Sequence, residues 1–528
     1  MRTNKSIRIF AILILGLFGT GLNDACCALA QTSSLAPTTM LRIGTIEERY
    51  QSYNIEMLEV TGGKFWKPYG PELSAALNQS SSPSAQSGND TPSGMKPGAL
   101  SVSPAYRFDQ CTIAEACSGP RPRLRARAEL GRTRRIFLNR KTPPLVLLLV
   151  STVSCRMRTG KRLLHLPKQR TPKSLPRSLP EWELAIQLAG GLSNRRSVLL
   201  DYTRTIGGRI AAAEFMNEPT LATTGGAPDG YDAAAYGRDF KLFHAFIRQA
   251  APDMLILGPG SVGDGSAPML KTSDLLASSQ PAKVDAFSYH HYGALSERCK
   301  AMGMQTKAED ALSEQWLRRT DETLAFYRQL RDQFAPNTPF WLTSTADAAC
   351  GGNSWARTFF DTFRYVDQLG RLAKQDVRVV IHNTLVASDY GLLDDKTLEP
   401  KPNYWGALLW RRMMGPTVLE SGVPIQNGLH IYAHCLRGRP GGLAILAINS
   451  SRIEPKSLDL PTPGDRYTLA AEKLEDTHVQ LNGRPLELGA DDDIPDLQGA
   501  PTQPGRLELA PATITFFAIA AAENRMCQ

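Results

Sequence analysis

Between residues 207 and 385 the sequence alternates between apolar, strand-like runs and amphipathic, helix-like runs. The runs predict strands over 207–219, 254–260, 284–293, 339–345 and 377–385, with helices over 231–252, 306–334 and 355–374. The strand segments are continuously apolar, as in parallel sheets that helices cover on both faces. The pattern therefore predicts five parallel strands of an α/β fold, and a closed (β/α)8 barrel would need three more.

Beyond this region the pattern changes to short strands separated by turn residues. Examples are "GLHIYAHCL", "GGLAILAIN" and "ATITFFAIAAA". Short strands at regular spacing are typical of an antiparallel β-sandwich. We therefore expect strands 4–8 of a TIM barrel in 197–410 and a β-sandwich in 411–528. The strands of 31–76 would belong to the sandwich or to the start of the barrel.

Residues 77–196 fit neither pattern. The stretch 77–98 is rich in Ser, Pro, Gly and Asn, which predicts a flexible linker. Residues 101–196 carry 20 Lys and Arg against 5 Asp and Glu. The net charge of the whole chain is +9, so the other 432 residues have a net charge of −6. Because the positive charge belongs to one segment, it does not indicate a nucleic-acid-binding protein. Three interpretations of 99–196 remain open: a basic arm for sulfated glycans, a low-order insert, or a frameshifted stretch that replaces the first barrel strands.

Residues 1–30 have the features of an export signal. Arg2, Lys5 and Arg8 precede the apolar run "IFAILILGLF", and "ALA" at 28–30 offers a cleavage site. We expect a cleaved signal and an exported protein, periplasmic or extracellular, without a stable membrane span. The alternative is an uncleaved membrane anchor. The Cys and His spacings are not those of a zinc site, and we expect no metal or organic cofactor.

The motif "EFMNEP" at 214–219 is the most informative for function. It closes an apolar strand, so Glu218 would lie at the mouth of a barrel, where barrel active sites are built. A carboxyl group at that position can exchange protons with a substrate, and the Asn217 amide can hydrogen-bond a sugar hydroxyl. The alternative is an ordinary surface loop.

Further motifs follow in chain order, and together they carry a family resemblance. They include "SYNIEMLEV", "DAFSYHHY", "PFWLTSTADAACGG", "SDYGLLD", "PNYWGALL" and "ITFFAI". Over 41–70 and 199–528 the chain resembles glycoside hydrolase family 79, the heparanase and β-glucuronidase family. The resemblance implies a monomeric (β/α)8 barrel with a β-sandwich and no cofactor. It also implies retaining hydrolysis of β-linked uronic acids, in a heparan sulfate-like glycosaminoglycan or a β-glucuronide.

The resemblance also assigns roles to single residues. Glu218 would be the general acid/base, and Ser344 stands at the nucleophile position. Gly351 and Gly352 would offer N–H groups, and Tyr390 its hydroxyl, to the uronic carboxylate. The full set of substrate-binding residues implied is Glu56, Asn217, His290, His291, Tyr292, Gly351, Gly352 and Tyr390. The alternatives are structural: a packing histidine at 290, a simple Gly-Gly turn, and a tyrosine that caps the eighth strand.

Two disulfides are expected. Cys435 and Cys527 match a family disulfide that ties the sandwich to the chain end. Cys299 and Cys350 follow two strands that should both end at the barrel mouth, so a second bridge is predicted there.

Ser344 conflicts with the chemistry that the family implies. Retaining glycosidases use two carboxyl groups roughly 5–5.5 Å apart, one as acid/base and one as nucleophile. A serine needs an adjacent base, for which His290 or His291 is the candidate, while Asp347 is expected beyond the strand end. We therefore expect greatly reduced hydrolysis. The alternatives are a non-catalytic protein that binds acidic glycans, and a degenerate product without function.

Overall fold

The computed structural model describes residues 33–56, 59, 62–78, 98–103, 107–109, 123–127, 133–137, 200–201, 204–205, 210–222, 227–264, 269–425, 428–489 and 492–528. The predicted signal segment 1–30 and almost all of the predicted linker 77–98 lie outside these residues. The contacts within the chain separate Met1–Gln31 from Thr32–Gln528, and all the elements below belong to the second unit.

A six-stranded parallel sheet carries most of the polar residues singled out above. The five predicted strands are confirmed, and one strand from the N-terminal segment adds a sixth at the edge. A parallel sheet in this order is consistent with part of a (β/α)8 barrel. Its order is β3 (Gln51–Tyr53), β13 (Val377–His382), β12 (Phe340–Ala349), β11 (Ala286–Leu295), β10 (Leu255–Ser261) and β9 (Ala212–Glu214).

Helices connect these strands, and side-chain caps explain where two of them, α5 and α7, begin. Asp232 accepts the N–H of Ala235 at 2.8 Å and starts the first of them. The predicted helix over 306–334 is divided, because Ser313 caps a new helix by accepting the N–H of Trp316 at 3.2 Å. The helices are α5 (Ala233–Ala250), α6 (Thr272–Ser279), α7 (Glu314–Leu317), α8 (Arg319–Phe334), α9 (Phe359–Lys374) and α10 (Pro402–Met413).

Two further sheets, a larger antiparallel one and a smaller mixed one, are formed mainly by the C-terminal part and share an apolar core. The larger one contains β2 (Arg42–Thr45), β14 (Met414–Leu419), β15 (Leu429–Leu436), β16 (Leu443–Asn449), β23 (Thr513–Ile519), β18 (Gly464–Ala470), β19 (Gln480–Leu481) and β20 (Arg484–Pro485), with β21 (Ala500–Thr502) paired to β18. The smaller one contains β1 (Ser33–Ser34), β17 (Lys456–Leu460) and β22 (Gly505–Leu509). Ile431, Ile445, Leu458 and Phe517 belong to their common core.

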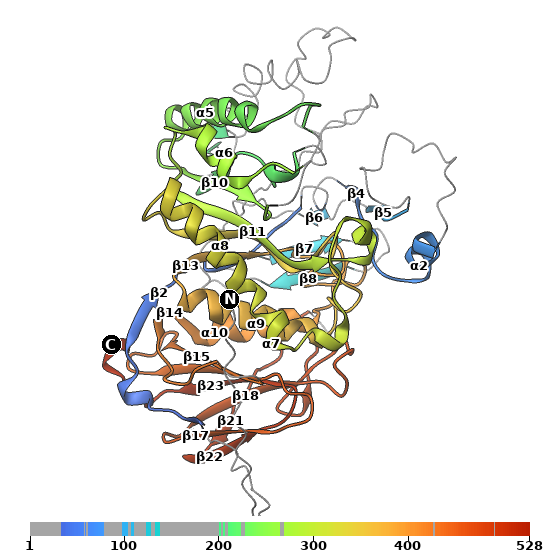
Figure 1. The fold of residues 1–528 in the computed structure, drawn as a ribbon. Helices are drawn as coiled ribbons and strands as arrows, with labels where there is room; N and C mark the ends of the chain where they lie inside the picture. Colours follow the sequence, from blue (N-terminus) through green and yellow to red (C-terminus); the bar gives the residue numbers. More distant parts are fainter. Residues whose placement is uncertain are drawn as a thin grey trace, which may run out of the picture. The chain divides into compact units, whose positions relative to one another are not determined.

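Helix α9 is buried along its length because it packs against both the parallel and the larger antiparallel sheet. It contacts β12 and β13 on one side and β15 and β16 on the other (Figure 1). Every residue of α9 except Lys374 is buried. One apolar core therefore runs from Phe340 through Phe363 to Tyr432. The boundary predicted at 410/411 falls inside α10, so the two parts of the chain meet at a helix.

Four short strands are described within the basic segment. β5 (Leu100–Ser103) pairs with β4 (Gly63–Trp66), which precedes α2 (Pro71–Asn78). β6 (Arg107–Asp109), β7 (Arg123–Arg127) and β8 (Thr133–Phe137) form a separate antiparallel sheet. The low-order segment expected at 99–196 stays a prediction, and these four strands lie among its described residues. Pairing between strands provides hydrogen bonds that the periodicity of one short segment does not reveal.

Candidate active site

Glu218 lies in the loop after β9, where the carboxyl ends of the parallel strands meet, and it contacts a buried histidine. Its Oε1 is 3.1 Å from Nδ1 of His290, and Nε2 of the same ring is 3.5 Å from Oε2 of Glu214. Burial disfavours the charged ring, but the neighbouring Glu214 and Glu218 outweigh it and raise the pKa of His290 to about 9. At neutral pH the ring is a cation paired with two carboxylates.

The backbone around Glu218 is unusual for a residue with a side chain. Glu218 has a φ of 46°, in the left-handed region, and its N–H donates to the carbonyl of Gly260 at 3.1 Å. Such conformations cost on the order of 1–3 kcal/mol and occur preferentially at functional sites. Asn217 precedes Glu218 in this loop and is half-buried.

Ser344 lies directly across from His290 in the ladder between β11 and β12. Its Oγ is 2.7 Å from the hydroxyl of Tyr292, and the Asn54 amide donates to it at 3.4 Å. Both neighbours are neutral, because burial raises the pKa of Tyr292 well above 10 and an amide does not titrate. Ser344 itself is buried. The predicted nucleophile position therefore holds a hydroxyl within a neutral network.

Two asparagines complete this network, and sequence reasoning missed both. Asn383 donates to the Tyr292 hydroxyl at 2.9 Å, and Asn54 donates to Oδ1 of Asn383. A signal was available in the sequence: Asn54 directly follows β3 and Asn383 directly follows β13. Side chains at those positions of a parallel barrel sheet enter the mouth of the barrel.

Glu56 and Tyr390 lie beside the same network. Both are buried, and Tyr390 packs in one apolar cluster with Tyr292 and Ala346. Burial raises the pKa of Tyr390 well above 10, and the nearby Tyr292 and Glu56 raise it further. The structure thus brings Glu56 and Tyr390 within electrostatic range of Tyr292.

Gly351 and Gly352 form the turn that follows β12, each with a φ of 85°. That conformation is open to glycine and strained for other residues. A Cβ on Gly351 would come within 2.5 Å of the Cβ of Trp66, and one on Gly352 would lie 3.2 Å from the Cβ of Tyr390. Close approach and positive φ therefore both require glycine in this turn.

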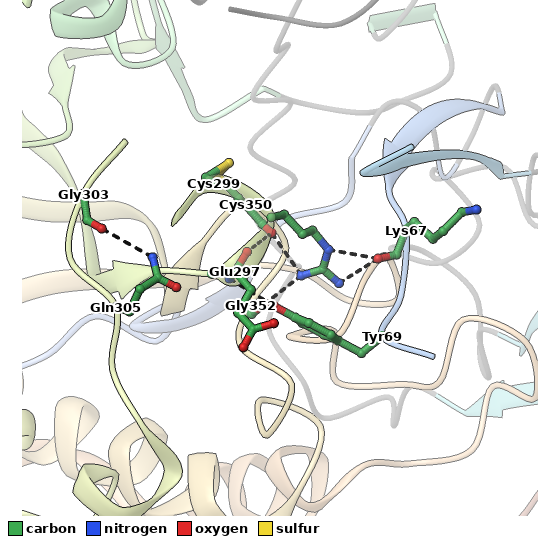
Figure 2. Close-up of a disulfide and its surroundings, with 10 residues drawn as sticks. Lys67, Tyr69, Glu297, Cys299, Gly303, Gln305, Cys350 and Gly352 are labelled. Carbon is green, nitrogen blue, oxygen red and sulfur yellow. Dashed lines mark hydrogen bonds between the residues drawn. A yellow bond between two sulfur atoms is a disulfide. The ribbon is translucent and has the colours of Figure 1, made fainter. Parts of the chain in front are cut away.

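Both predicted disulfides are confirmed. Cys299 and Cys350 are bonded with a Cα–Cα distance of 6.3 Å, which ties the Gly-Gly turn to the segment after β11 (Figure 2). Cys435 and Cys527 are bonded with a Cα–Cα distance of 5.2 Å, beside the larger antiparallel sheet.

His291 lies apart from the cluster around Ser344. Adjacent strand residues point to opposite faces of a sheet, so His291 faces away from the side that carries His290 and Tyr292. Burial lowers the pKa of His291 to about 3, and the guanidinium groups of Arg364 and Arg319 lower it as well. The structure therefore places His291 toward helices α8 and α9.

Asp347 lies within β12, three residues after Ser344. The prediction that it lies beyond the strand end is wrong, because β12 continues through Ala349. Asp347 is fully buried and accepts the N–H of Asn353 at 2.9 Å. Burial, followed by the neighbouring Asp361, raises its pKa to about 8.

The arrangement supplies an acid or base at Glu218 and a hydroxyl at Ser344. A retaining glycosidase needs a carboxyl group at each of two such positions. His290 is protonated and paired with its two carboxylates, and His291 lies toward the helices. Neither histidine is therefore suited to remove the Ser344 proton, and a serine without a base is a weak nucleophile.

Within the described part of the chain, no group of three or more His, Cys, Asp or Glu side chains is placed to hold a metal ion. None of the described helices combines the length and the apolar character that a bilayer crossing requires.

The parallel sheet brings together an acid from the loop after β9, an imidazole from β11 and a hydroxyl from β12, which is consistent with a site built on a (β/α)8 barrel. No family model matches the chain. The chain is 31% identical over 254 residues to "Heparanase-like protein 1" of Arabidopsis thaliana, covering 48% of this chain and 45% of that protein. It is 29% identical over 356 residues to "Heparanase" of Mus musculus, covering 63% and 64%. It is also 29% identical over 261 residues to "Inactive heparanase-2" of Homo sapiens, covering 45% and 43%.

The matches to heparanases, heparanase-like proteins and a baicalin-β-D-glucuronidase support the heparanase- and β-glucuronidase-like family that the motifs predicted, glycoside hydrolase family 79. Each match spans less than two thirds of the relative's own length. Among solved structures, a family 44 xyloglucanase from Paenibacillus polymyxa has a TM-score of 0.44 at 14% identity, covering 62% of this chain and 70% of that chain. A likeness at that level carries no conclusion about function.

Proposed function

We propose that this chain is a retaining-glycosidase-like protein that binds β-linked uronic acids and hydrolyses them at a greatly reduced rate. The uronic acid would belong to a heparan sulfate-like glycosaminoglycan or to a β-glucuronide. Glu218 would act as the general acid/base, and Ser344 would stand in the nucleophile position. One observation carries the proposal: Ser344 Oγ lies across from His290 and 2.7 Å from the Tyr292 hydroxyl, where the reaction needs a carboxylate.

The other polar groups support retained sugar binding. In this proposal Asn217 binds a hydroxyl beside the scissile bond, and Glu56 and Tyr292 contact the sugar ring. Gly351 and Gly352 would receive the uronic carboxylate, with the Tyr390 hydroxyl beside them. No cofactor takes part. We assign His290 to holding Glu218, because its contacts are with the two carboxylates.

The wider scheme belongs to the same proposal. The two C-terminal sheets would form the β-sandwich of 411–528, packed on a (β/α)8 barrel that includes 197–410. The chain would be exported to the periplasm or the extracellular space and act as a monomer on its acidic glycan. Two disulfides, Cys299–Cys350 and Cys435–Cys527, support an oxidising compartment.

The test is to restore the carboxylate. Purified full chain is assayed with p-nitrophenyl β-glucuronide as wild type, Ser344→Glu, Ser344→Ala and Ser344→Glu with Glu218→Gln. We expect the wild type and Ser344→Ala to be close to background, and Ser344→Glu to be faster by on the order of 10²-fold or more. Adding Glu218→Gln should return the rate to background. A wild type that turns over rapidly and gains nothing from Ser344→Glu contradicts the proposal.

A second candidate function is a non-catalytic glycan-binding protein, which the similarity to "Inactive heparanase-2" favours. It predicts affinity for heparan sulfate that falls steeply with added salt, and no gain of turnover in Ser344→Glu. A third outcome, a chain without a cooperative thermal transition, would indicate the degenerate product.

A further inference from the structure

The turn after β12 is held through its carbonyl groups. The carbonyl of Cys350 accepts the Ser296 hydroxyl at 2.8 Å and Nη1 of Arg298 at 3.1 Å. The same Nη1 donates to the carbonyl of Gly352 at 2.8 Å. One guanidinium nitrogen therefore bridges the two ends of the Gly-Gly turn.

The carbonyl between them, that of Gly351, is held separately, by the Ser388 hydroxyl at 2.9 Å. In a trans peptide the N–H points opposite to the carbonyl of the same unit, and neither peptide bond here is cis. The N–H of Gly351 is therefore directed away from Arg298, and that of Gly352 away from Ser388. None of the described residues accepts a hydrogen bond from either N–H.

The turn needs this support because its backbone is unfavourable. Cys350 has a φ of 62°, and Gly351 and Gly352 follow at 85° each. A left-handed residue with a side chain costs roughly 1–2 kcal/mol. Without fixed donors on its carbonyls, the turn would relax to other conformations, and the two N–H groups would no longer point in a fixed direction.

Arg298 itself has no donor left for a ligand. All five of its N–H groups are engaged: Nε and Nη2 donate to the carbonyl of Lys67 at 2.9 and 2.7 Å, Nη2 donates to Asp389, and Nη1 makes the two bonds to the turn. The guanidinium also stacks on Tyr69, 4.1 Å from the ring centre, and its side chain is fully buried. Arg298 can thus act only through the turn.

The Cys299–Cys350 disulfide joins the segment that carries Arg298 to the turn that Arg298 holds. Cys299 is the chain neighbour of Arg298, and Cys350 begins the turn that Arg298 holds. Figure 2 shows Lys67, Tyr69, Cys350 and Gly352 gathered beside the bridge. The covalent bond therefore fixes the backbone that carries the guanidinium to the backbone that carries the acceptors.

We propose that Arg298, Ser388 and the Cys299–Cys350 disulfide are positioning groups that make the site prefer a carboxylate to a hydroxymethyl group. They fix the Gly351 and Gly352 N–H groups, which can bind both oxygens of a carboxylate but only one of a hydroxymethyl group. This inference rests on the proposed function, in which a uronic carboxylate meets this turn.

The test compares methyl β-D-glucuronide with methyl β-D-glucoside, which differ only at that group, by calorimetric titration of the full chain. The wild type should bind the glucuronide more tightly. Arg298→Gln should reduce the ratio of the two affinities by roughly tenfold, with the loss confined to the glucuronide. Arg298→Lys should reduce it less, because one ammonium can still donate to one carbonyl. Ser388→Ala and Cys299→Ser with Cys350→Ser should reduce it by about threefold.

Cys435→Ser with Cys527→Ser is the matched control: it should lower the melting temperature and leave the ratio unchanged. Ser388→Ala removes a single hydroxyl, so it tests the inference even if Arg298 variants do not fold. Folded variants that keep the wild-type ratio overturn the inference and leave the proposed function intact. A wild type that does not distinguish the two sugars overturns both.

Discussion

Two buried histidines in this protein have nearly the same electrostatic surroundings but lie in different regions. His290 at the end of the parallel sheet lies between Glu214 and Glu218. His430 on β15 has its Nδ1 2.6 Å from Asp367 and its Nε2 3.0 Å from Glu314. Burial opposes the charge of both rings, and the carboxylates on either side raise the pKa of each to about 9.

The difference lies in what else the carboxylates contact. Around His430 every carboxylate has a second partner: Arg371 donates to Asp367 at 2.6 Å and to Glu314 at 2.8 Å, and Tyr432 donates to Asp367 at 2.6 Å. Around His290, no Lys or Arg of the described residues forms an ion pair with Glu214 or Glu218, and the neighbouring strands carry Ser344 and Tyr292. A raised histidine pKa is common to both regions, whereas the arginine that neutralises the carboxylates is present around His430 and not among the described residues around His290.

The largest effect should come from breaking the His430 cluster at its arginine. Arg371 is almost fully buried and pairs with Glu314, Asp321 and Asp367. Arg371→Met should lower the free energy of unfolding by about 3–5 kcal/mol, because it leaves buried carboxylates without their cation. Urea or guanidinium titration measures this.

The matched control for that change is Arg318→Met, which removes an exposed pair with Glu322. It should change stability by no more than about 0.5 kcal/mol. Equal effects of the two substitutions would show that the buried ion pairs of Arg371 stabilise the fold no more than an exposed pair does.

The next largest effect should be a pH dependence of the free energy of unfolding, which we attribute to His430. Its pKa is raised from 6.5 to about 9 in the folded protein, so the stabilisation by the protonated ring is complete below pH 6.5 and is lost as pH rises through 9. Between pH 6 and pH 10 the wild type should lose on the order of 3 kcal/mol more stability than His430→Gln. If the free energy of unfolding changes with pH equally in the wild type and in the variant, the His430 ring is not charged in the folded protein.

Among the changes to the two histidine clusters, the smallest effect on stability should come from His290→Gln. Water can solvate the partly exposed Glu218 when the imidazolium is removed, so the free energy of unfolding should fall by about 1–2 kcal/mol. In the Ser344→Glu background the same change should lower kcat for p-nitrophenyl β-glucuronide by on the order of tenfold, whereas His430→Gln should leave kcat within about twofold. If both histidine variants lower kcat alike, the distinction between the two regions fails.

Much of the fold was predictable because single segments carried strong patterns. The apolar runs that became β9–β13 needed no partner to be recognised, and they located Glu218, His290 and Ser344 in or directly after neighbouring strands. The Cys299–Cys350 bridge followed from the same logic, since two parallel strands end at one edge of a sheet.

What could not be predicted depends on register and on contacts between distant segments. His290 and His291 are adjacent and chemically identical, so only the observed pairing of β11 with β12 decides which of them meets Glu218. Asn54 and Asn383 are 329 residues apart and form one hydrogen bond, which no local pattern contains. Asp347 was misplaced because β12 runs four residues past the predicted end.

The pairing of the first three strands also determines when the sheets can finish forming during synthesis. β1, β2 and β3 lie within residues 33–53, yet they pair with β17, β14 and β13, so their partners are Leu458, Thr417 and Ile381 among others. During synthesis these early segments leave the ribosome more than 300 residues ahead of the strands they join, and their edges stay unpaired for that time. A nascent chain interrupted before residue 377 would therefore have no partner for any of the three strands, and both the parallel and the antiparallel sheets would be finished only as the last third of the chain emerges.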